Sequence, residues 1–175
     1  MNDLHLYNIP FVGLKDGVSE FNYSIDGSFF EHFPNSPISN CEVTVKLFFE
    51  KKPSLFILSF ELDGTVNVEC DRCLQRFDQP IFLNYNLYVK LKDNEIEKEN
   101  EADVVYISRT ETHLDIAPYI YDYINLSLPV RKVHPLNENG KEQCDPEIIK
   151  ILNNKKEQKQ PAVDPRWEAL EKLKG

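Results

Sequence analysis

Two cysteines separated by two residues, Cys70 and Cys73, stand in the stretch VECDRCLQRF, directly after an alternating, strand-like run. Such a turn presents two sulfur atoms to one metal ion, and zinc sites are commonly completed by two ligands from elsewhere in the chain. His134 and Cys144, which flank the loop HPLNENGKEQC, are the best distant partners. The sequence therefore predicts a zinc site formed by Cys70, Cys73, His134 and Cys144.

Spacing alone leaves other roles open for this cysteine pair. The separation between His134 and Cys144 is longer than in compact zinc fingers, so reduced thiols that only pack against strand ends are an equally good interpretation. A redox pair is less favoured, because thioredoxin-type motifs open a helix in a βαβ unit, whereas LQRFDQPIFL leads into another strand. Cys41 has no nearby ligand and is expected to be a buried free thiol.

Residues that could support catalysis do not form a pattern in this sequence. Three histidines, His5, His32 and His113, have no nucleophile and acid arranged around them. The six glycines are not clustered, so a phosphate-binding loop is not expected. A small hydrolase or nuclease would need convergent carboxylates around a metal, and the sequence offers no such set. We therefore predict no catalytic residues and a protein that is not an enzyme.

The elements that must position these residues are mainly strands. Apolar and polar residues alternate through most of the region between Cys41 and Leu91, as they do in half-buried strands. We interpret this region as four strands joined by short turns, with Asp63-Gly64 as a hairpin turn. Further strands are expected at residues 4–11, 18–25 and 103–108. The predicted fold class is α+β: a mainly antiparallel sheet, barrel-like or a half-open sandwich, with short helices in the C-terminal half.

The periodicity becomes helical after Asp115, which is a plausible N-cap. Ile116, Ile120 and Ile124 fall on one face of this helix, which ends at Pro129. The same helix carries Tyr119, Tyr121 and Tyr123. Stacking of these rings on nucleic-acid bases is one interpretation, and half-buried packing is the more common one. The earlier stretch GSFFEHF is expected to be a short helix or an irregular apolar lid.

The C-terminal part divides the chain into a body, a linker and a docking element. Asp145 and Pro146 predict the start of a short helix at the end of the body, which comprises residues 1–153. A lysine- and glutamine-rich linker follows at residues 154–163, and a docking helix at residues 164–175. That helix carries an apolar stripe of Trp167, Leu170 and Leu173. The acidic stretch 92–103 lacks apolar periodicity and is expected to be a flexible loop.

Charge is distributed unevenly along the chain. The formal net charge is −9, but from Lys150 to Gly175 there are seven bases and four acids, so the remaining 149 residues carry −12. Such a body is a poor general binder of phosphate backbones, and RNA contact would have to use the basic tail. The sequence shows neither a signal peptide nor a membrane-spanning stretch. We therefore expect a cytoplasmic protein with reduced thiols and no membrane contact.

The order of these motifs resembles that of the YceD family, the large ribosomal RNA subunit accumulation proteins. The resemblance runs from about Val66 to the C-terminus and is looser in the N-terminal third. The positions that carry it are Cys70, Cys73, Asp115, Asp122, Leu128, Pro129, His134 and Cys144. Many relatives have a denser cysteine cluster after the leucine-proline pair, whereas this chain keeps only His134 and Cys144.

The resemblance implies a non-enzymatic role in large-subunit ribosomal RNA accumulation and ribosome assembly. A ribosomal protein or a pre-ribosomal particle would be the partner, and the acidic body suits contact with basic proteins more than with RNA. The alternative is a zinc-binding structural or adaptor module without a ribosomal role.

Overall fold

The computed structural model describes residues 3–92, 103–137, 139–141 and 143–158 of the chain. The chain forms two compact units. The first contains the described residues within 3–69 and 76–132, and the second contains Cys70–Gln75 together with the described residues within 133–158. The second unit is thus built from two separate stretches of sequence.

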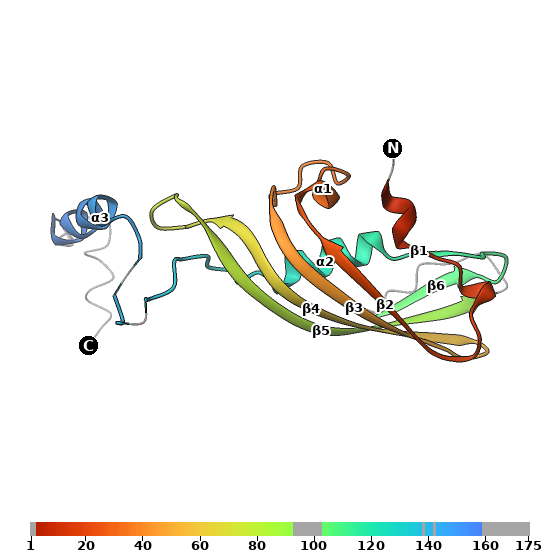
Figure 1. The fold of residues 1–175 in the computed structure, drawn as a ribbon. Coiled ribbons are helices and arrows are strands. Elements are labelled where there is room, and N and C mark those ends of the chain that lie inside the picture. The colour runs from red at the N-terminus through yellow and green to blue at the C-terminus, as the bar shows by residue number, and fades with distance from the viewer. Residues whose placement is uncertain (1–2, 93–102, 138, 142, 159–175) are drawn as a thin grey trace, which may run out of the picture. The chain divides into compact units, whose positions relative to one another are not determined.

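The first unit is organised around a five-stranded open sheet (Figure 1). Its strands, in spatial order, are β2 (Gly17–Ile25), β3 (Cys41–Lys51), β4 (Leu55–Glu69), β5 (Arg76–Lys92) and β6 (Val104–Ser108). The first three pairings are antiparallel, and the pairing of β5 with β6 is parallel. The predicted α+β class with a mainly antiparallel sheet is therefore confirmed, and the sheet is not closed into a barrel.

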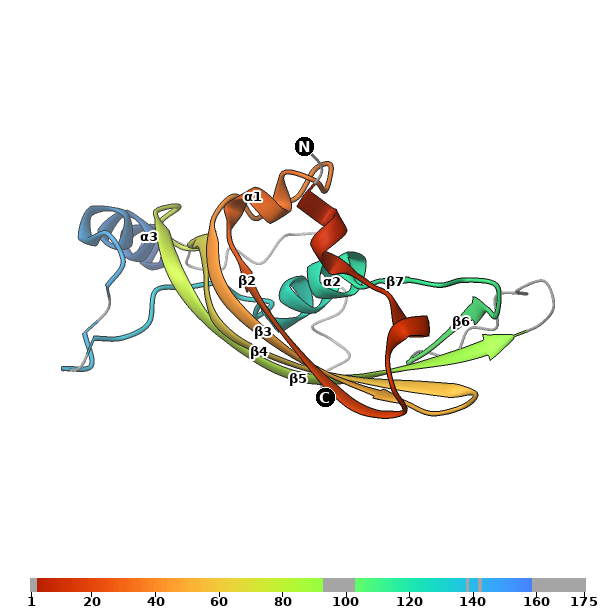
Figure 2. The same cartoon turned by 45° about the vertical axis from the view of Figure 1, so that its right-hand side comes forward.

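The alternating pattern of the sequence produces one buried face of the sheet. Leu47 on β3 pairs with Phe60 on β4, which pairs with Tyr85 on β5. Helix α2 (Ala117–Ser127) lies across the concave face of the sheet (Figure 2). Its Ile120 is fully buried, and the ring of Tyr123 packs edge-on against Phe60 with centroids 5.1 Å apart. The apolar face of α2 and the apolar face of the sheet thus pack against each other in one core.

The prediction of a hairpin turn at Asp63-Gly64 is wrong. β4 continues through these residues as a single 15-residue strand, so the region between Cys41 and Leu91 contains three strands rather than four. Gly64 has a φ of +155°, and a Cβ atom there would lie 2.1 Å from the carbonyl oxygen of Glu42. Gly64 is required because the backbone of β3 approaches closely in the middle of the strand. An Asp-Gly dipeptide occurs both at such positions and in hairpin turns, so the sequence alone does not distinguish the two.

Short elements of the N-terminal part complete the first unit. They are the 3₁₀ helices η1 (Asp3–Tyr7) and η2 (Phe11–Gly13), strand β1 (Asn8–Ile9), which pairs with β7 (Leu114–Asp115), and helix α1 (Gly27–Phe30). α1 settles the choice left open for GSFFEHF in favour of a short helix, with Asp26 as its N-cap. The longer helices α2 and α3 lie in the C-terminal half, as predicted, but α1, η1 and η2 show that helical turns are not confined to it. The prediction of a strand at residues 4–11 is wrong except at Asn8–Ile9, because 3₁₀ turns occupy both sides of these two residues.

The second unit contains the cysteine turn at residues 70–75 and helix α3 (Pro146–Gln158). α3 includes the first five residues of the segment predicted to be a linker. The rest of that linker and the docking helix with Trp167, Leu170 and Leu173 lie outside the described residues, as does most of the acidic stretch 92–103. Among the described helices, none has both the length and the apolar character needed to cross a membrane.

Candidate metal centre

Residues 70–75 form a tight turn that carries two of the sulfur atoms. The amide of Cys70 donates to the carbonyl oxygen of Gln75 at 2.9 Å, and the amide of Leu74 donates to the carbonyl oxygen of Cys70 at 2.9 Å. Leu74 has a φ of 63°, a left-handed conformation that reverses the chain just after Cys73. The turn buries both thiols: Cys70 is 0% and Cys73 is 2% exposed.

The loop from His134 to Cys144 is closed by a turn of its own. The amide of Asn137 donates to the carbonyl oxygen of Lys141 at 2.9 Å, and the Asn137 side-chain oxygen accepts from the Lys141 amide at 2.8 Å. Gly140 takes a φ of 72°, which glycine adopts at no steric cost. This inner turn shortens the path between His134 and Cys144, so a ten-residue separation still returns both side chains to one place.

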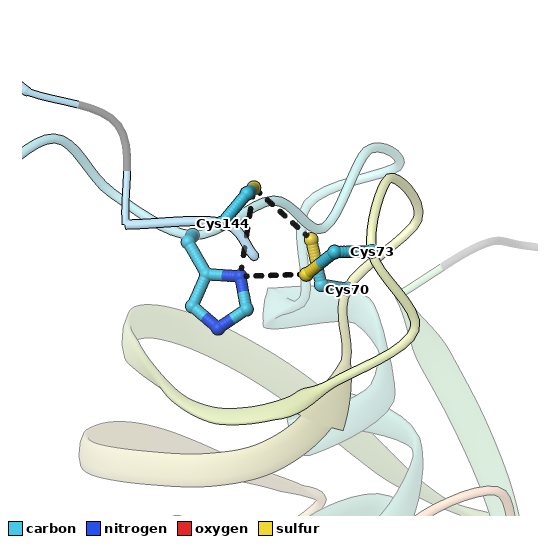
Figure 3. A group of neighbouring side chains, drawn as sticks. Cys70, Cys73 and Cys144 are labelled. Carbon is cyan, nitrogen blue, oxygen red and sulfur yellow. Dashed lines mark hydrogen bonds between the residues drawn. The ribbon is translucent and has the colours of Figure 1, made fainter. Parts of the chain in front are cut away.

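The four side chains converge within the second unit. The sulfur atoms of Cys70 and Cys144 are 3.8 Å apart, and Nδ1 of His134 lies 3.4 Å from the sulfur of Cys73. All four ligand atoms lie within 4.8 Å of one another. Figure 3 shows the three labelled cysteines directing their sulfur atoms toward one another. The structure therefore brings together all four residues that the sequence selected, while their role as metal ligands stays a prediction.

The spacing of these atoms suits a tetrahedral metal ion. With zinc bonds of about 2.3 Å to sulfur and about 2.0 Å to nitrogen, two sulfurs stand about 3.8 Å apart, and a sulfur and a nitrogen about 3.5 Å apart. The structure has 3.8 Å between Cys70 and Cys144, and 3.4 and 3.7 Å from His134 to Cys73 and Cys144. Three cysteines and one histidine are a common donor set of structural zinc sites, which leave no position open for water.

Electrostatics around the thiols favours a cation. Burial raises the pKa of the Cys70 thiol, but hydrogen bonds from the backbone at Arg72, Cys73 and His134 outweigh it, so that its pKa is lowered. Burial and the neighbouring Cys70 sulfur raise the pKa of Cys144. A thiolate beside a protonated thiol is tolerated, but three thiolates this close repel one another. A divalent cation removes that repulsion and deprotonates its thiol ligands.

Asp145 fixes the segment that leaves the site. Its carboxylate accepts from the backbone amide of Glu147 at 2.8 Å, which caps the first turn of α3. The same carboxylate accepts from the side-chain amide of Gln75 at 3.2 Å. The Asp-Pro pair predicted the helix cap from the sequence, whereas the sequence contained no signal for the contact between Gln75 and Asp145.

The other residues considered for chemistry have structural roles. Cys41 is 7% exposed and not in a disulfide, as predicted, and its sulfur lies 3.5 Å from the carbonyl oxygen of Ile25. Tyr121 stacks on Phe33 with centroids 4.2 Å apart, and Tyr123 is buried in the core. These two tyrosines of α2 are therefore packing residues.

One grouping that the sequence did not suggest gathers Asp26, Ser28 and His32 around a single pocket. The Ser28 hydroxyl donates to the carboxylate of Asp26 at 2.6 Å, and Nδ1 of His32 lies 3.1 Å from the carbonyl oxygen of Ser28. In a catalytic triad, the histidine would instead contact the serine hydroxyl. This arrangement is the N-cap of α1 and provides no activated nucleophile.

Comparison with known proteins gives one match. A family model described as "Large ribosomal RNA subunit accumulation protein YceD" matches residues 58–174. No curated protein and no solved structure shows a significant match to the sequence. The matched range covers more than half of the chain and contains all four residues of the cluster. The chain therefore belongs to the YceD family of large ribosomal RNA subunit accumulation proteins.

Proposed function

We propose that this protein supports the accumulation of large-subunit ribosomal RNA and the assembly of the large subunit, acting in the cytoplasm without catalysing a reaction. The observation that carries the proposal is the family match over residues 58–174, which includes both halves of the second unit's cysteine cluster. The description of the family supplies the ribosomal role, and the contacts and charges of this chain support how the role is performed.

The cluster of Cys70, Cys73, His134 and Cys144 is proposed to hold zinc. Zinc bound there would cross-link the turn at residues 70–75 to the loop before α3 and so stabilise the second unit. Four protein ligands complete a tetrahedral shell, which is the arrangement of structural rather than catalytic zinc. Gln75 and Asp145 would hold the two halves in register, since their side chains already join them at 3.2 Å.

Protein contacts are proposed to be the principal means of action. The body carries a net charge of −12 outside the last 26 residues, which repels phosphate and attracts the lysine- and arginine-rich segments of ribosomal proteins. The direct partner would be a ribosomal protein or a pre-ribosomal particle. The C-terminal residues, with a net charge of +3, could make a secondary contact with RNA.

A strain lacking the protein tests the ribosomal role. Large-subunit RNA is expected to fall relative to small-subunit RNA, and precursor particles are expected to accumulate in a sucrose gradient. Replacing Cys70 and Cys73 by serine should give a similar, milder defect, while the matched variant Cys41→Ser should complement fully because Cys41 lies outside the cluster. Normal subunit ratios in the deletion strain, under both slow and fast growth, would refute the ribosomal role.

The cysteine cluster also supports a second candidate function. A closed Cys₃His site is common in structural and adaptor modules of many kinds. If the protein were such a module without a ribosomal role, affinity purification from cell extract would recover partners with no enrichment of ribosomal proteins or precursor particles.

A further inference from the structure

Among the described residues, one edge of strand β5 is paired with a neighbouring strand along only part of its length. On one side it pairs with β4 from Arg76 to Lys90. On the other side β6 covers only Tyr88–Lys92. In the part of the chain that the structure describes, no strand pairs with residues 76–87 on that second side. Open edges of this length are usually blocked or covered, because their free N–H and C=O groups are a template for another strand.

The backbone groups that face this open edge can be identified from Tyr88. The amide of Tyr88 donates to the carbonyl oxygen of Asp103, on the β6 side. Backbone groups of an antiparallel strand alternate in direction, so the N–H and C=O groups of Asn86, Asn84 and Phe82 point to the same side. Pro80 falls in the same series, where its missing N–H breaks no bond with β4, and this explains how a proline is accommodated within the strand.

The outer face of the sheet beside this edge carries an aromatic ring and carboxylates. Phe82, on the open edge, is 67% exposed although phenylalanine is among the residues most often buried. Across the pairing with β4, it stands opposite Asp63, and Asn84 stands opposite Glu61. Phe82, Glu61 and Asp63 also line a surface hollow of about 380 Å³. Neither carboxylate forms an ion pair with another described residue.

With this open edge beside the carboxylates of Glu61 and Asp63, the geometry points to a binding site for an extended, lysine- or arginine-rich protein segment. The segment adds to β5 as a sixth strand. The backbone of the segment would pair with Phe82, Asn84 and Asn86. Every second side chain of an added strand lies on the outer face, about 4.8 Å from Phe82 and roughly twice that from Asp63. A lysine or arginine there reaches the carboxylate while its stem covers the phenylalanine ring.

The same features disfavour RNA as the occupant. Proteins that bind nucleic acid contact the phosphates through lysine and arginine side chains. The hollow beside this edge contains two carboxylates, Glu61 and Asp63, and only one basic residue, Lys46. Main-chain pairing also requires a peptide backbone in the partner. The inference rests on the proposed function for the identity of the segment, which would then belong to a basic ribosomal protein.

A pair of synthetic peptides tests the site on the full-length protein. The probe is a labelled decapeptide of alternating lysine and threonine. The control is the same peptide N-methylated at alternate residues, which keeps its charge but cannot pair along one edge. Fluorescence anisotropy should show binding of the first, weakened at least about tenfold in the second. Equal binding of the two peptides would overturn the inference, because charge alone would then explain the contact.

Variants of the edge provide the second arm. Asn84→Pro removes an N–H that faces the open edge and leaves the hydrogen bonds to β4 in place, in the same way that Pro80 is accommodated. Asn84→Ser is the matched control, because serine keeps the N–H. Binding should fall about tenfold for the proline variant and stay unchanged for serine. The double variant Glu61→Gln, Asp63→Asn should bind the lysine peptide more weakly, and its affinity for the peptide should depend less on the salt concentration. Binding of the proline variant at the wild-type level would overturn the inference.

Hydrogen exchange of the unaltered protein gives a readout that does not depend on how the variants fold. Peptide binding should protect the amides of Phe82, Asn84 and Asn86, while the amides of Leu83 and Tyr85, which face β4, stay as they were. An absence of new protection at saturating peptide would contradict strand addition. If a single-stranded RNA oligonucleotide bound and protected these same amides, the occupant of the edge would be RNA and not a protein segment.

Complementation separates this inference from the proposed function. If the deletion strain loses large-subunit RNA and Asn84→Pro fails to restore it while Asn84→Ser succeeds, both stand. If Asn84→Pro restores the RNA fully, the edge is not the site of action and the ribosomal role is unaffected. If the deletion strain has normal subunit ratios but the peptide still binds with the expected pattern, the ribosomal role is wrong and the edge remains a binding site for basic segments.

Discussion

The side-chain amide of Gln75 lies 3.2 Å from the carboxylate of Asp145, and this contact joins the cysteine turn to the first turn of α3. Asp145 directly follows Cys144, so the residue that caps the helix is next to a residue of the cluster. The start of the helix and the cluster are therefore expected to gain or lose order together. Metal content and the local stability of α3 can be measured separately, and both bear on this coupling.

Metal analysis of protein purified without added metal should find about one zinc per chain, because the donor set and spacing fit a tetrahedral site. Cys70→Ser should lose most of it, while Cys41→Ser should keep it, since Cys41 is buried elsewhere in the first unit. Removal of the metal with a chelator should speed hydrogen exchange in the loop at residues 134–144 and leave the sheet amides protected. Metal-free wild-type protein with an equally protected loop would contradict this expectation.

Replacing Asp145 by alanine should destabilise the first turn of α3 by about 1 kcal/mol, because the cap acceptor for the Glu147 amide is lost. Asparagine at the same position retains a side-chain oxygen and should cost much less. Amide exchange of the helix measures the difference, while the global unfolding of the sheet should be unchanged. Equal exchange in the alanine and asparagine variants would show that the cap contributes little.

Gly64→Ala should destabilise the first unit by about 2–4 kcal/mol, because the new methyl group would collide with the backbone of β3 in a strained conformation. The Cβ atom would lie 2.1 Å from the carbonyl oxygen of Glu42. Gly13→Ala is the matched control, since a Cβ atom there meets nothing within 4 Å. Urea unfolding should place the Gly13 variant within about 0.5 kcal/mol of wild type. A Gly64 variant as stable as the control would show that β3 and β4 separate at little cost.

Stability at alkaline pH should reflect the environment of Tyr23. Burial, followed by the nearby Tyr7, raises its pKa to about 12. Below a pH of about 10 the tyrosine is neutral in both folded and unfolded states, so its contribution is constant. Above that value the unfolded state ionises first, so stability falls as the pH rises toward 12. Tyr23→Phe should flatten the decline measured by urea unfolding from pH 10 to 12. An unchanged slope would exclude Tyr23 as a source of the decline.

Periodicity and residue chemistry were enough to predict the sheet, α2 and the membership of the cluster. Alternation in CEVTVKLFFE placed Val43, Val45 and Leu47 on the buried face, where each is at most 1% exposed. The cluster was predictable because only five cysteines and histidines follow the N-terminal third, and four of them, all except His113, form two pairs that could each supply ligands to one metal ion. Asp63-Gly64 was misread because a glycine needed for close backbone approach looks the same in sequence as a glycine in a turn.

Features set by non-local contacts could not be predicted from the sequence. The parallel pairing of β6 with β5 depends on which strand lies at the sheet edge, and alternation within VVYIS carries no information about direction. The contact between Gln75 and Asp145 joins residues 70 positions apart. Pro80 is compatible with its place in β5 because the pairing with β6 begins only at Tyr88, which leaves Pro80 on an edge where an N–H is not needed. The role of this proline could therefore be understood only from the sheet topology.

The order of the cluster along the chain has a consequence for how each new molecule matures. Cys70 and Cys144 are separated by 74 positions, and residues 76–132 of the first unit are synthesised between the two halves of the second. A nascent chain therefore carries two cysteines without their partners while most of the sheet and α2 are made. Closing so long a loop costs less once the intervening residues have folded. Capture of the proposed zinc is thus expected to be the last step of maturation, and a chain arrested before His134 would leave a thiol pair open to oxidation.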